Sequence, residues 1–166
     1  MIAISGPKCS GLFKIRRASL EDLPAVIEIN RSSLPENYPF YFFREHLENW
    51  PEAFLVAEIE GKVVGYVMCR VEVGFGHLNK VPMRRGHVIS LAVAERYRRL
   101  GIGTALMKEA IEALKNVYKA REVYLEVRVS NKPAISLYEK LGFEVTRRIP
   151  AYYHDGEDAF LMARAL

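Results

Sequence analysis

Apolar residues in the second half of the chain recur with two different periods. Segments 87–94 and 122–129 are predicted strands, and in the second of them apolar and polar residues alternate. The segment between them, about 102–118, repeats its apolar residues at helical spacing, which predicts a helix with one buried stripe. That stripe consists of Ile102, Ala105, Leu106, Ala110, Ala113, Leu114 and Val117.

One more helix and two more strands follow. Segment 132–142 predicts a helix that ends at Gly142, because glycine readily adopts the left-handed conformation after a last helical turn. Segments 143–149 and 158–166 predict closing strands. A run of strands and helices in this order predicts an α/β fold, with a mixed sheet that carries helices on its faces.

The first half of the chain predicts shorter elements. Residues 1–12 are rich in Gly, Pro, Ser and Lys and are expected to form a flexible leader, which leaves one domain at 13–166. Segment 13–18 predicts a strand, and 53–73 predicts a hairpin that turns at Gly61. Segment 74–86 is expected to be a loop.

Ser19 and Asp22 have the spacing of a capping box, which predicts a helix over 19–31. Its apolar face is expected to consist of Leu20, Leu23, Val26 and Ile27. Two prolines interrupt 32–43, so a second helix is expected only over 44–49.

Composition narrows the class of protein. The chain has 166 residues, of which 50% are hydrophobic and 27% charged, as in soluble globular proteins. It has no membrane-length apolar run and no signal-peptide pattern, and Cys9 and Cys69 are too few for a disulfide framework, so we expect a cytoplasmic protein. The net charge of +4 suits an anionic ligand but does not by itself indicate nucleic-acid binding. No His, Cys or Asp spacing predicts a metal site.

The most informative turn is Arg98-Arg99-Leu-Gly101-Ile-Gly103, between a predicted strand and a predicted helix. The first N–H groups of a helix lack partners and attract phosphate. Glycine lets the backbone approach a bulky anion, and arginines (Arg96 included) add charge. An ordinary strand-to-helix turn with surface arginines explains the pattern equally well. The spacing matches neither a dinucleotide fingerprint nor an NTPase loop.

The segment VAERYRRLGIGTAL resembles the acetyl-CoA signature of the GNAT acetyltransferases, and SNKPAISLYEKLGF resembles the segment of that family that carries an Asn and a Tyr beside the cofactor. Together with LPENYP, GHVISLAV and YYHDGEDAF, these motifs resemble the catalytic subunit of NatA-type protein N-terminal acetyltransferases, above all its stand-alone archaeal form. The resemblance covers about 13–166. Gly103, His154 and Phe160 stand where the family usually has other residues.

The resemblance implies catalytic roles for three residues. Glu126 and His87 would hold a water that relays a proton, and the Tyr138 hydroxyl would reach the cofactor sulfur. From pattern alone, Glu126 lies on the polar face of its strand with Glu122, Tyr124 and Arg128, and that face reads as solvated. His87 reads equally as a structural histidine at a strand end, and Tyr138 as a core aromatic.

The resemblance also implies the binding sites. Strand backbone before the signature would pair with the pantetheine arm, and the Val93 amide would polarise the thioester carbonyl. Asn131, by itself a helix N-cap, would contact the same arm. The expected cofactor residues are Leu91, Ala92, Val93, Arg98, Arg99, Gly101, Ile102, Gly103, Thr104, Asn131 and Tyr138. The expected peptide residues are Leu34, Pro35, Glu36, Tyr38, Tyr152 and Tyr153.

Glu36 by itself reads as a solvated loop carboxylate, and the tyrosines as packing at a sheet edge. The resemblance makes Glu36 a determinant of which first residue is accepted. An acidic wall disfavours a bulky apolar side chain, so small first residues such as Ser and Ala are expected, with some Met-initiated substrates.

The expected function is transfer of acetyl from acetyl-CoA to the α-amine of protein N-termini or nascent chains. Two alternatives remain open: a GNAT enzyme for lysine side chains or a small amine, and a non-catalytic acyl-CoA-binding module. We expect a monomer without a metal, without direct nucleic-acid or membrane binding, and compatible with association with the ribosome.

Overall fold

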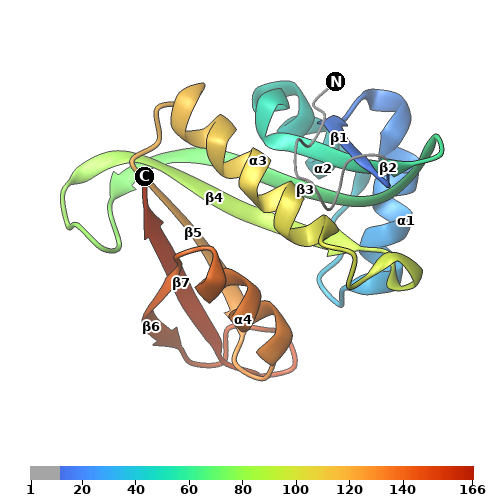
Figure 1. The fold of residues 1–166 in the computed structure, drawn as a ribbon. Helices are drawn as coiled ribbons and strands as arrows, with labels where there is room; N and C mark the ends of the chain where they lie inside the picture. Colours follow the sequence, from blue (N-terminus) through green and yellow to red (C-terminus); the bar gives the residue numbers. More distant parts are fainter. Residues whose placement is uncertain (1–11) are drawn as a thin grey trace.

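A computed structural model describes residues 12–166, so Cys9 and nearly all of the predicted leader lie outside the described residues. Figure 1 shows this part of the chain as a twisted sheet with helices packed against it. The strands are β1 (Lys14–Arg17), β2 (Phe54–Ile59), β3 (Lys62–Phe75), β4 (Pro82–Val93), β5 (Glu122–Arg128), β6 (Glu144–Ile149) and β7 (Ala159–Ala165). The α-helices are α1 (Leu23–Ser33), α2 (Phe40–Asn49), α3 (Ile102–Asn116) and α4 (Lys132–Lys140).

The sheet formed by residues 12–166 has seven strands in the order β1-β2-β3-β4-β5-β7-β6. Every neighbouring pair is antiparallel except β4 and β5, which run parallel. This mixed and mostly antiparallel α/β arrangement confirms the predicted fold class.

Strands β4 and β5 stay together over a short stretch only. Their register joins residues 85–87 to residues 122–124, although both strands continue beyond that point. Past this stretch β5 and β7 diverge from β4, and the two halves of the sheet form an open V in Figure 1. Residues 91–93 of β4 lie beyond the last pairing with β5, so no strand of residues 12–166 pairs there with the edge of β4 that faces the gap.

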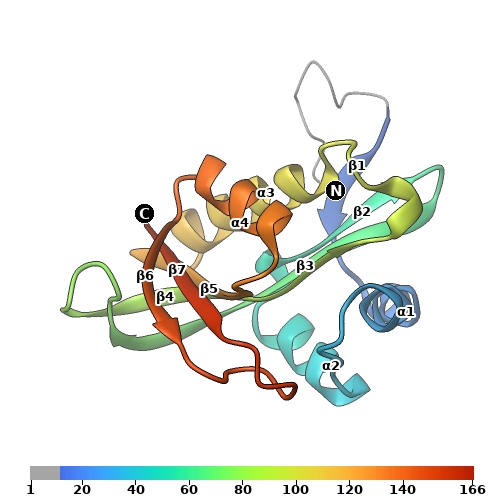
Figure 2. The same ribbon diagram turned by 90° about the horizontal axis from the view of Figure 1, so that it is seen from below.

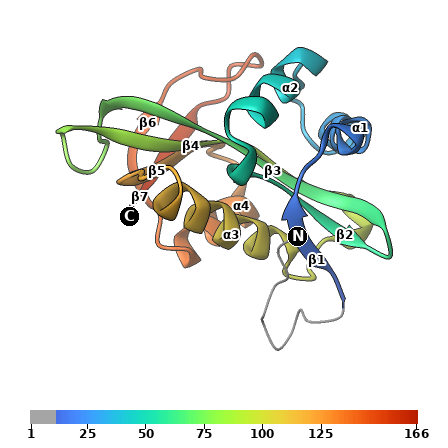
Figure 3. The same ribbon diagram turned by 90° about the horizontal axis from the view of Figure 1, so that it is seen from above.

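The helices cover the sheet from both sides. Figures 2 and 3 show α1 and α2 on one face and α3 and α4 on the other. We call these the α1–α2 face and the α3–α4 face. Because strand side chains alternate, each face has its own core. Buried residues of the α1–α2 face include Leu23, Val26, Phe43, Tyr66 and Met68. Those of the α3–α4 face include Leu55, Val67, Leu106, Leu125 and Tyr138.

Three expectations about the elements were wrong in detail. Helix α2 begins at Phe40 rather than Arg44, because Pro39 stands at the N-cap position, where a proline does not disturb the helix. The predicted loop over 74–86 is mostly strand, since β3 and β4 extend each other's pairing out to Phe75 and Pro82. Leu20 is half exposed, because it lies in a 3₁₀ turn before α1.

Candidate active site

The two faces of β5 carry different chemistry. Val123, Leu125 and Val127 are buried in the core of the α3–α4 face, as the alternation predicted. The opposite face is not solvated, contrary to the interpretation from pattern alone, since Glu122 and Tyr124 are 1% and 6% exposed.

The loop between β3 and β4 explains this burial. Its backbone N–H groups at His77, Leu78 and Asn79 donate to the Glu122 carboxylate at 2.8, 3.0 and 3.2 Å. The rings of His77 and His87 flank Tyr124, with centroids 4.4 and 4.0 Å from its ring. A pattern in β5 alone could not reveal this cover.

A β-bulge in β4 re-aims the His87 side chain. Met68 of β3 pairs with Ser90 and Cys69 pairs with Val88, which leaves Ile89 as the extra residue. Without that residue, strand alternation would turn His87 toward the α3–α4 face. With it, His87 lies on the α1–α2 face, as Ser90 does on the other side of the bulge.

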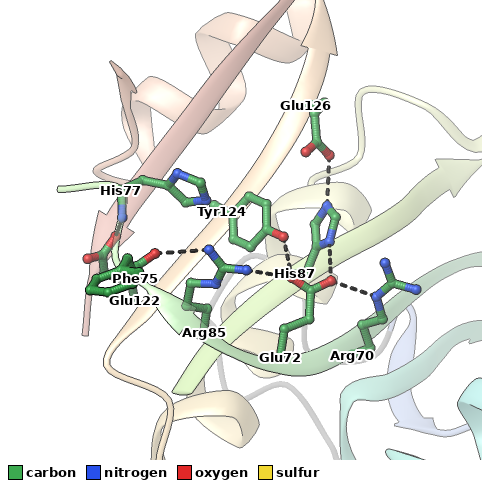
Figure 4. A network of polar contacts seen from close by, with 9 residues as sticks. All are labelled: Arg70, Glu72, Phe75, His77, Arg85, His87, Glu122, Tyr124 and Glu126. Carbon is green, nitrogen blue, oxygen red and sulfur yellow. Dashed lines mark hydrogen bonds and ion pairs between the residues drawn. The ribbon is translucent and has the colours of Figure 1, made fainter. Parts of the chain in front are cut away.

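His87 and Glu126 are in direct contact. Nε2 of His87 lies 2.7 Å from Oε1 of Glu126. The other ring nitrogen, Nδ1, lies 2.9 Å from Oε2 of Glu72 (Figure 4). Arg70 and Tyr124 also donate hydrogen bonds to Glu72. The imidazole therefore bridges two carboxylates, and sequence reasoning did not identify Glu72.

These contacts shift the titration of the cluster. Burial lowers the pKa of His87, but the hydrogen bonds to Glu126 and Glu72 outweigh it, so the net pKa lies above the usual imidazole value. Burial raises the pKa of Glu72, and the bonds from His87, Tyr124 and Arg70 more than reverse this, so its pKa lies far below the usual range. Burial and the bond to Glu72 raise the pKa of Tyr124. Glu72 is thus a carboxylate and Tyr124 a neutral phenol near neutral pH.

Tyr138 lies on the opposite side of the sheet from His87. It belongs to the core of the α3–α4 face, and its ring centroid is 5.9 Å from that of Phe143. Its hydroxyl forms no hydrogen bond within residues 12–166, and burial raises its pKa to about 12. The ring is therefore a core aromatic, as the spacing alone suggested. The hydroxyl is neutral and still has a proton to donate.

The glycine turn before α3 has the geometry of an anion cradle. Gly101 is the N-cap residue with φ +83°, a conformation that glycine adopts without strain. No side chain of the described residues caps this end of α3. Nε of Arg98 donates to the carbonyl of Val93 at 2.9 Å, which ties the turn to the end of β4. The remaining predicted cofactor residues of this region are Leu91 and Ala92 in β4, Arg99 in the turn, and Ile102, Gly103 and Thr104 in the first turn of α3.

Asn131 is an N-cap, as its type predicted. Its side-chain oxygen accepts the backbone N–H of Ala134 at 3.3 Å at the start of α4. Its amide nitrogen forms no hydrogen bond within the described part of the chain and stays available to a ligand.

Arg128 joins two loops from opposite ends of the chain. Its guanidinium donates to Glu36 at 2.7 Å, and to Asp155 and Glu157 at 2.8 Å each. The same group lies 4.1 Å from the ring centroid of Tyr153. From pattern alone, Arg128 was interpreted as a solvated strand residue and Glu36 as a solvated loop carboxylate. The structure pairs the two charges.

The loop that carries Glu36 is anchored to the sheet. The side-chain amide of Asn30, which is fully buried, donates to the Glu36 carbonyl and to the Tyr66 hydroxyl, both at 3.1 Å. Tyr66 in turn contacts Ser90 at 2.7 Å. Asn30 is a second residue that sequence reasoning missed, because its partners lie on other elements.

Aromatic residues line the same side. Tyr38 stacks on Phe42 with ring centroids 4.5 Å apart, and burial raises the Tyr38 pKa to about 12. Tyr152 and Tyr153 meet edge to face with centroids 4.9 Å apart. Leu34 packs against the core of the α1–α2 face, while Pro35 is exposed. The predicted peptide residues thus belong to two loops that Arg128 brings together.

None of the helices in residues 12–166 is long and apolar enough to cross a membrane. The same part of the chain holds no group of three or more His, Cys, Asp or Glu side chains suited to a metal ion.

Comparison with known proteins identifies the family. Residues 23–143 match the sequence profile of the acetyltransferase (GNAT) family. An N-alpha-acetyltransferase of Sulfurisphaera tokodaii is 58% identical over 156 residues, which cover 93% of each chain. The N-terminal acetyltransferase A complex catalytic subunit NAA10 of Arabidopsis thaliana is 41% identical over 154 residues, covering 92% of this chain and 77% of NAA10.

A solved structure supports the same family assignment. A chain in the NatC complex bound to Gag peptide and CoA superposes with a TM-score of 0.83 at 28% identity, covering 93% of this chain and 99% of that one. The fold, the family profile and the relatives lead to one conclusion: this chain belongs to the GNAT acetyltransferase family and, within it, to the N-alpha-acetyltransferases that resemble the NatA catalytic subunit.

Proposed function

We propose that the protein transfers acetyl directly from acetyl-CoA to the α-amine of protein N-termini and nascent chains. One observation carries the proposal. Most of the candidate cofactor residues lie on the α3–α4 face of the sheet and the candidate peptide residues on the α1–α2 face, on either side of the gap where β4 and β5 part. The side chain of Ala92 is the exception, since it packs in the core of the α1–α2 face. Two substrates can then approach from opposite faces and react through the gap, without an acetylated side chain as intermediate.

Acetyl-CoA is the donor that GNAT acetyltransferases bind. The uncapped start of α3, with Gly101 and the arginines Arg98 and Arg99, is suited to its pyrophosphate. The unpaired edge of β4 at 91–93 offers backbone groups to the amide-bearing pantetheine arm. The Val93 amide is our candidate for polarising the thioester carbonyl, as an oxyanion donor does.

Glu126 and His87 are our candidate proton acceptor. A protein α-amine has a pKa of about 8, so near neutral pH much of it is protonated and needs only mild base help. As the amine nitrogen bonds to the acetyl carbon, its proton passes to the Glu126–His87 pair, directly or through a water. The carbon–sulfur bond breaks, and the leaving thiolate takes a proton from the Tyr138 hydroxyl, whose pKa of about 12 keeps it protonated until then.

Glu36 is our candidate for selecting the first residue. Its carboxylate accepts a hydrogen bond from Arg128 and disfavours a large apolar side chain at the same wall, because the pair would lose its remaining solvent. We propose that small first residues such as Ser and Ala are preferred, with some acceptance of Met-initiated chains.

A peptide panel tests the proposal. Matched peptides that begin with Ser, Ala or Met-Leu are offered with acetyl-CoA, each with a free and a blocked α-amine, and one blocked peptide carries a lysine. The proposal predicts acetylation of free α-amines only. Transfer to the lysine or to small amines would support the broader GNAT alternative, and binding of acetyl-CoA without any turnover would support a non-catalytic module. Sedimentation with and without ribosomes tests whether the expected monomer associates with them.

A further inference from the structure

Glu72 lies at the centre of the polar cluster in Figure 4. Oε2 contacts Nδ1 of His87 at 2.9 Å and accepts from Nε of Arg70 at 2.7 Å. Oε1 accepts from the Tyr124 hydroxyl and from Nη2 of Arg85 at 3.2 Å. The four contacts come from three different strands, so the position of Glu72 is over-determined.

The chemistry of Glu72 dictates the protonation of its histidine neighbour. An ionised carboxylate can only accept hydrogen bonds, so Nδ1 of His87 must carry a proton to contact it. A neutral imidazole has one N–H. Whenever His87 is neutral, that proton stays on Nδ1, and Nε2 presents its lone pair to Glu126.

We propose that Glu72 is a positioning residue that fixes His87 as the Nδ1–H tautomer, so that Nε2 is free to share the proton taken up with Glu126. The inference rests on the proposed function of the Glu126–His87 pair. It extends that function by naming the residue that keeps the pair competent, without contact between Glu72 and either substrate.

The charged groups around His87 support these separate roles of Glu72 and Glu126. On β3 it faces Glu72 and Arg70, on β5 it faces Glu126 and Tyr124, and on its own strand Arg85 lies beside Glu72. His46 of α2 and His77 of the β3–β4 loop are the further titratable rings nearby, and burial lowers the pKa of both. Arg70 and Arg85 both form ion pairs with Glu72.

Glu72→Gln separates the charge from the shape. An amide in this position can donate to Nδ1, which would move the single proton of the neutral ring to Nε2 and block proton exchange with Glu126. We expect kcat to fall roughly tenfold to a hundredfold, in the range of general-base loss. The affinity for acetyl-CoA and the KM for peptide should stay within twofold. The acidic limb of the kcat profile should move to lower pH, because removing an anion lowers the pKa of His87.

Two further variants keep the test clear. Tyr124→Phe removes one bond to Glu72 and leaves the stacked ring, so a smaller loss of kcat is expected. Glu58→Gln is the matched control, since Glu58 is also ion-paired, to Lys14 and Arg16 at 3.1 Å each, but lies on β2 away from the cluster. It should leave kcat and its pH profile unchanged.

Long-range proton–nitrogen NMR of protein labelled with ¹⁵N-histidine reads the tautomer without any turnover. The chain has four histidines, and a His87→Ala sample identifies the signal. Above the pKa of His87, the wild type should keep its proton on Nδ1, and Glu72→Gln should move it to Nε2. A wild type protonated on Nε2, or a Glu72→Gln protein with unchanged kcat, would overturn the proposal. An inactive wild type that still shows Nδ1–H would overturn the proposed function instead.

Discussion

The guanidinium of Arg128 lies 2.7 Å from the carboxylate of Glu36, although 92 residues separate them in the chain. The same guanidinium reaches Asp155 and Glu157, so one side chain sets the distance between two loops. The peptide cleft that we propose between these loops depends on that single cation.

Arg128→Ala should therefore widen the cleft and leave three carboxylates without their partner. We expect KM for peptide to rise about tenfold or more, about 1.4 kcal/mol, with the Kd for acetyl-CoA unchanged. Arg128→Lys keeps the positive charge and should recover part of the loss. The recovery should be incomplete, because an ammonium cannot contact several carboxylates with the same planar geometry. Steady-state kinetics and calorimetry measure the two effects.

Arg44→Ala is the matched control for this prediction. Arg44 pairs with Glu48 at 2.8 Å on an exposed helix surface, where such pairs contribute little. A rise in KM as large as that of Arg128→Ala would show that the loss of any arginine has this effect.

Glu36→Val should shift the substrate preference toward Met-Leu ends. The substitution removes the acidic wall and adds an apolar surface, and the change in discrimination should be about 1–3 kcal/mol. Glu36→Gln separates charge from shape, since it keeps the volume and weakens the pair with Arg128. The measurement is kcat/KM on peptides that begin with Ser, Ala or Met-Leu. Equal ratios in the wild type and both variants would make Glu36 an ordinary loop residue.

The two glycines of the signature should behave in opposite ways. Gly101 has φ +83°, so Gly101→Val strains the backbone as well as filling the cradle, and should destabilise the fold. Gly101→Asn tolerates that conformation, and should weaken acetyl-CoA binding at least tenfold, about 1.4 kcal/mol, with the fold retained.

An added Cβ at Gly103 meets only Leu137 and Val93, at 3.8 and 4.0 Å. Gly103→Ala should therefore raise the free energy of unfolding by about 0.5–1 kcal/mol.

Calorimetry of acetyl-CoA binding and thermal denaturation check both glycines. An unchanged affinity for acetyl-CoA in folded Gly101→Asn protein would exclude this turn as the binding site of the pyrophosphate.

Glu126→Gln and His87→Ala should lower kcat with little effect on acetyl-CoA binding. We expect the loss at neutral pH to lie near the low end of the range for general bases, about 10²-fold, because part of the amine is already neutral. The loss should shrink as the pH rises through the amine pKa of about 8, since the amine is then already neutral without help from a base. Full activity of the double variant at neutral pH would exclude both residues from the proton path.

Asn30→Ala should lower the free energy of unfolding by about 1–3 kcal/mol, because it leaves the carbonyl of Glu36 without its buried donor. It should also raise KM for peptide, since the loop loses its anchor to Tyr66. Asn49→Ala is the matched control, because the Asn49 amide donates to a carbonyl on the exposed surface of α2. Chemical denaturation and peptide kinetics compare the two variants.

The local spacing of apolar residues was sufficient to predict the elements that bury one face. Five residues of the predicted α3 stripe are buried, but the prediction missed the buried Met107 and Ile111, and Val117 is exposed beyond the end of the helix at Asn116. The sequence also predicted the mixed sheet. It could not predict that β4 begins at Pro82, because β3 extends that strand by pairing with it.

Residues whose roles depend on distant partners were missed. Arg128 and Glu72 are polar strand residues in the sequence, and their significance comes from loop closure and from cross-strand register. The burial of Glu122 likewise depends on backbone donors of a loop at His77, Leu78 and Asn79. Alternation in one strand reports which residues share a face, but not what covers that face.

The sheet with a separate core on each face also has an evolutionary consequence. Tyr138 and the start of α3 share no core with Tyr38 or with the anchor of the 34–39 loop at Asn30. Mutations can then remodel recognition of the acceptor while donor affinity is inherited unchanged, and their free-energy effects should add across the sheet. With the acceptor site that we propose, a lineage with this architecture can diversify the proteins it modifies one loop at a time.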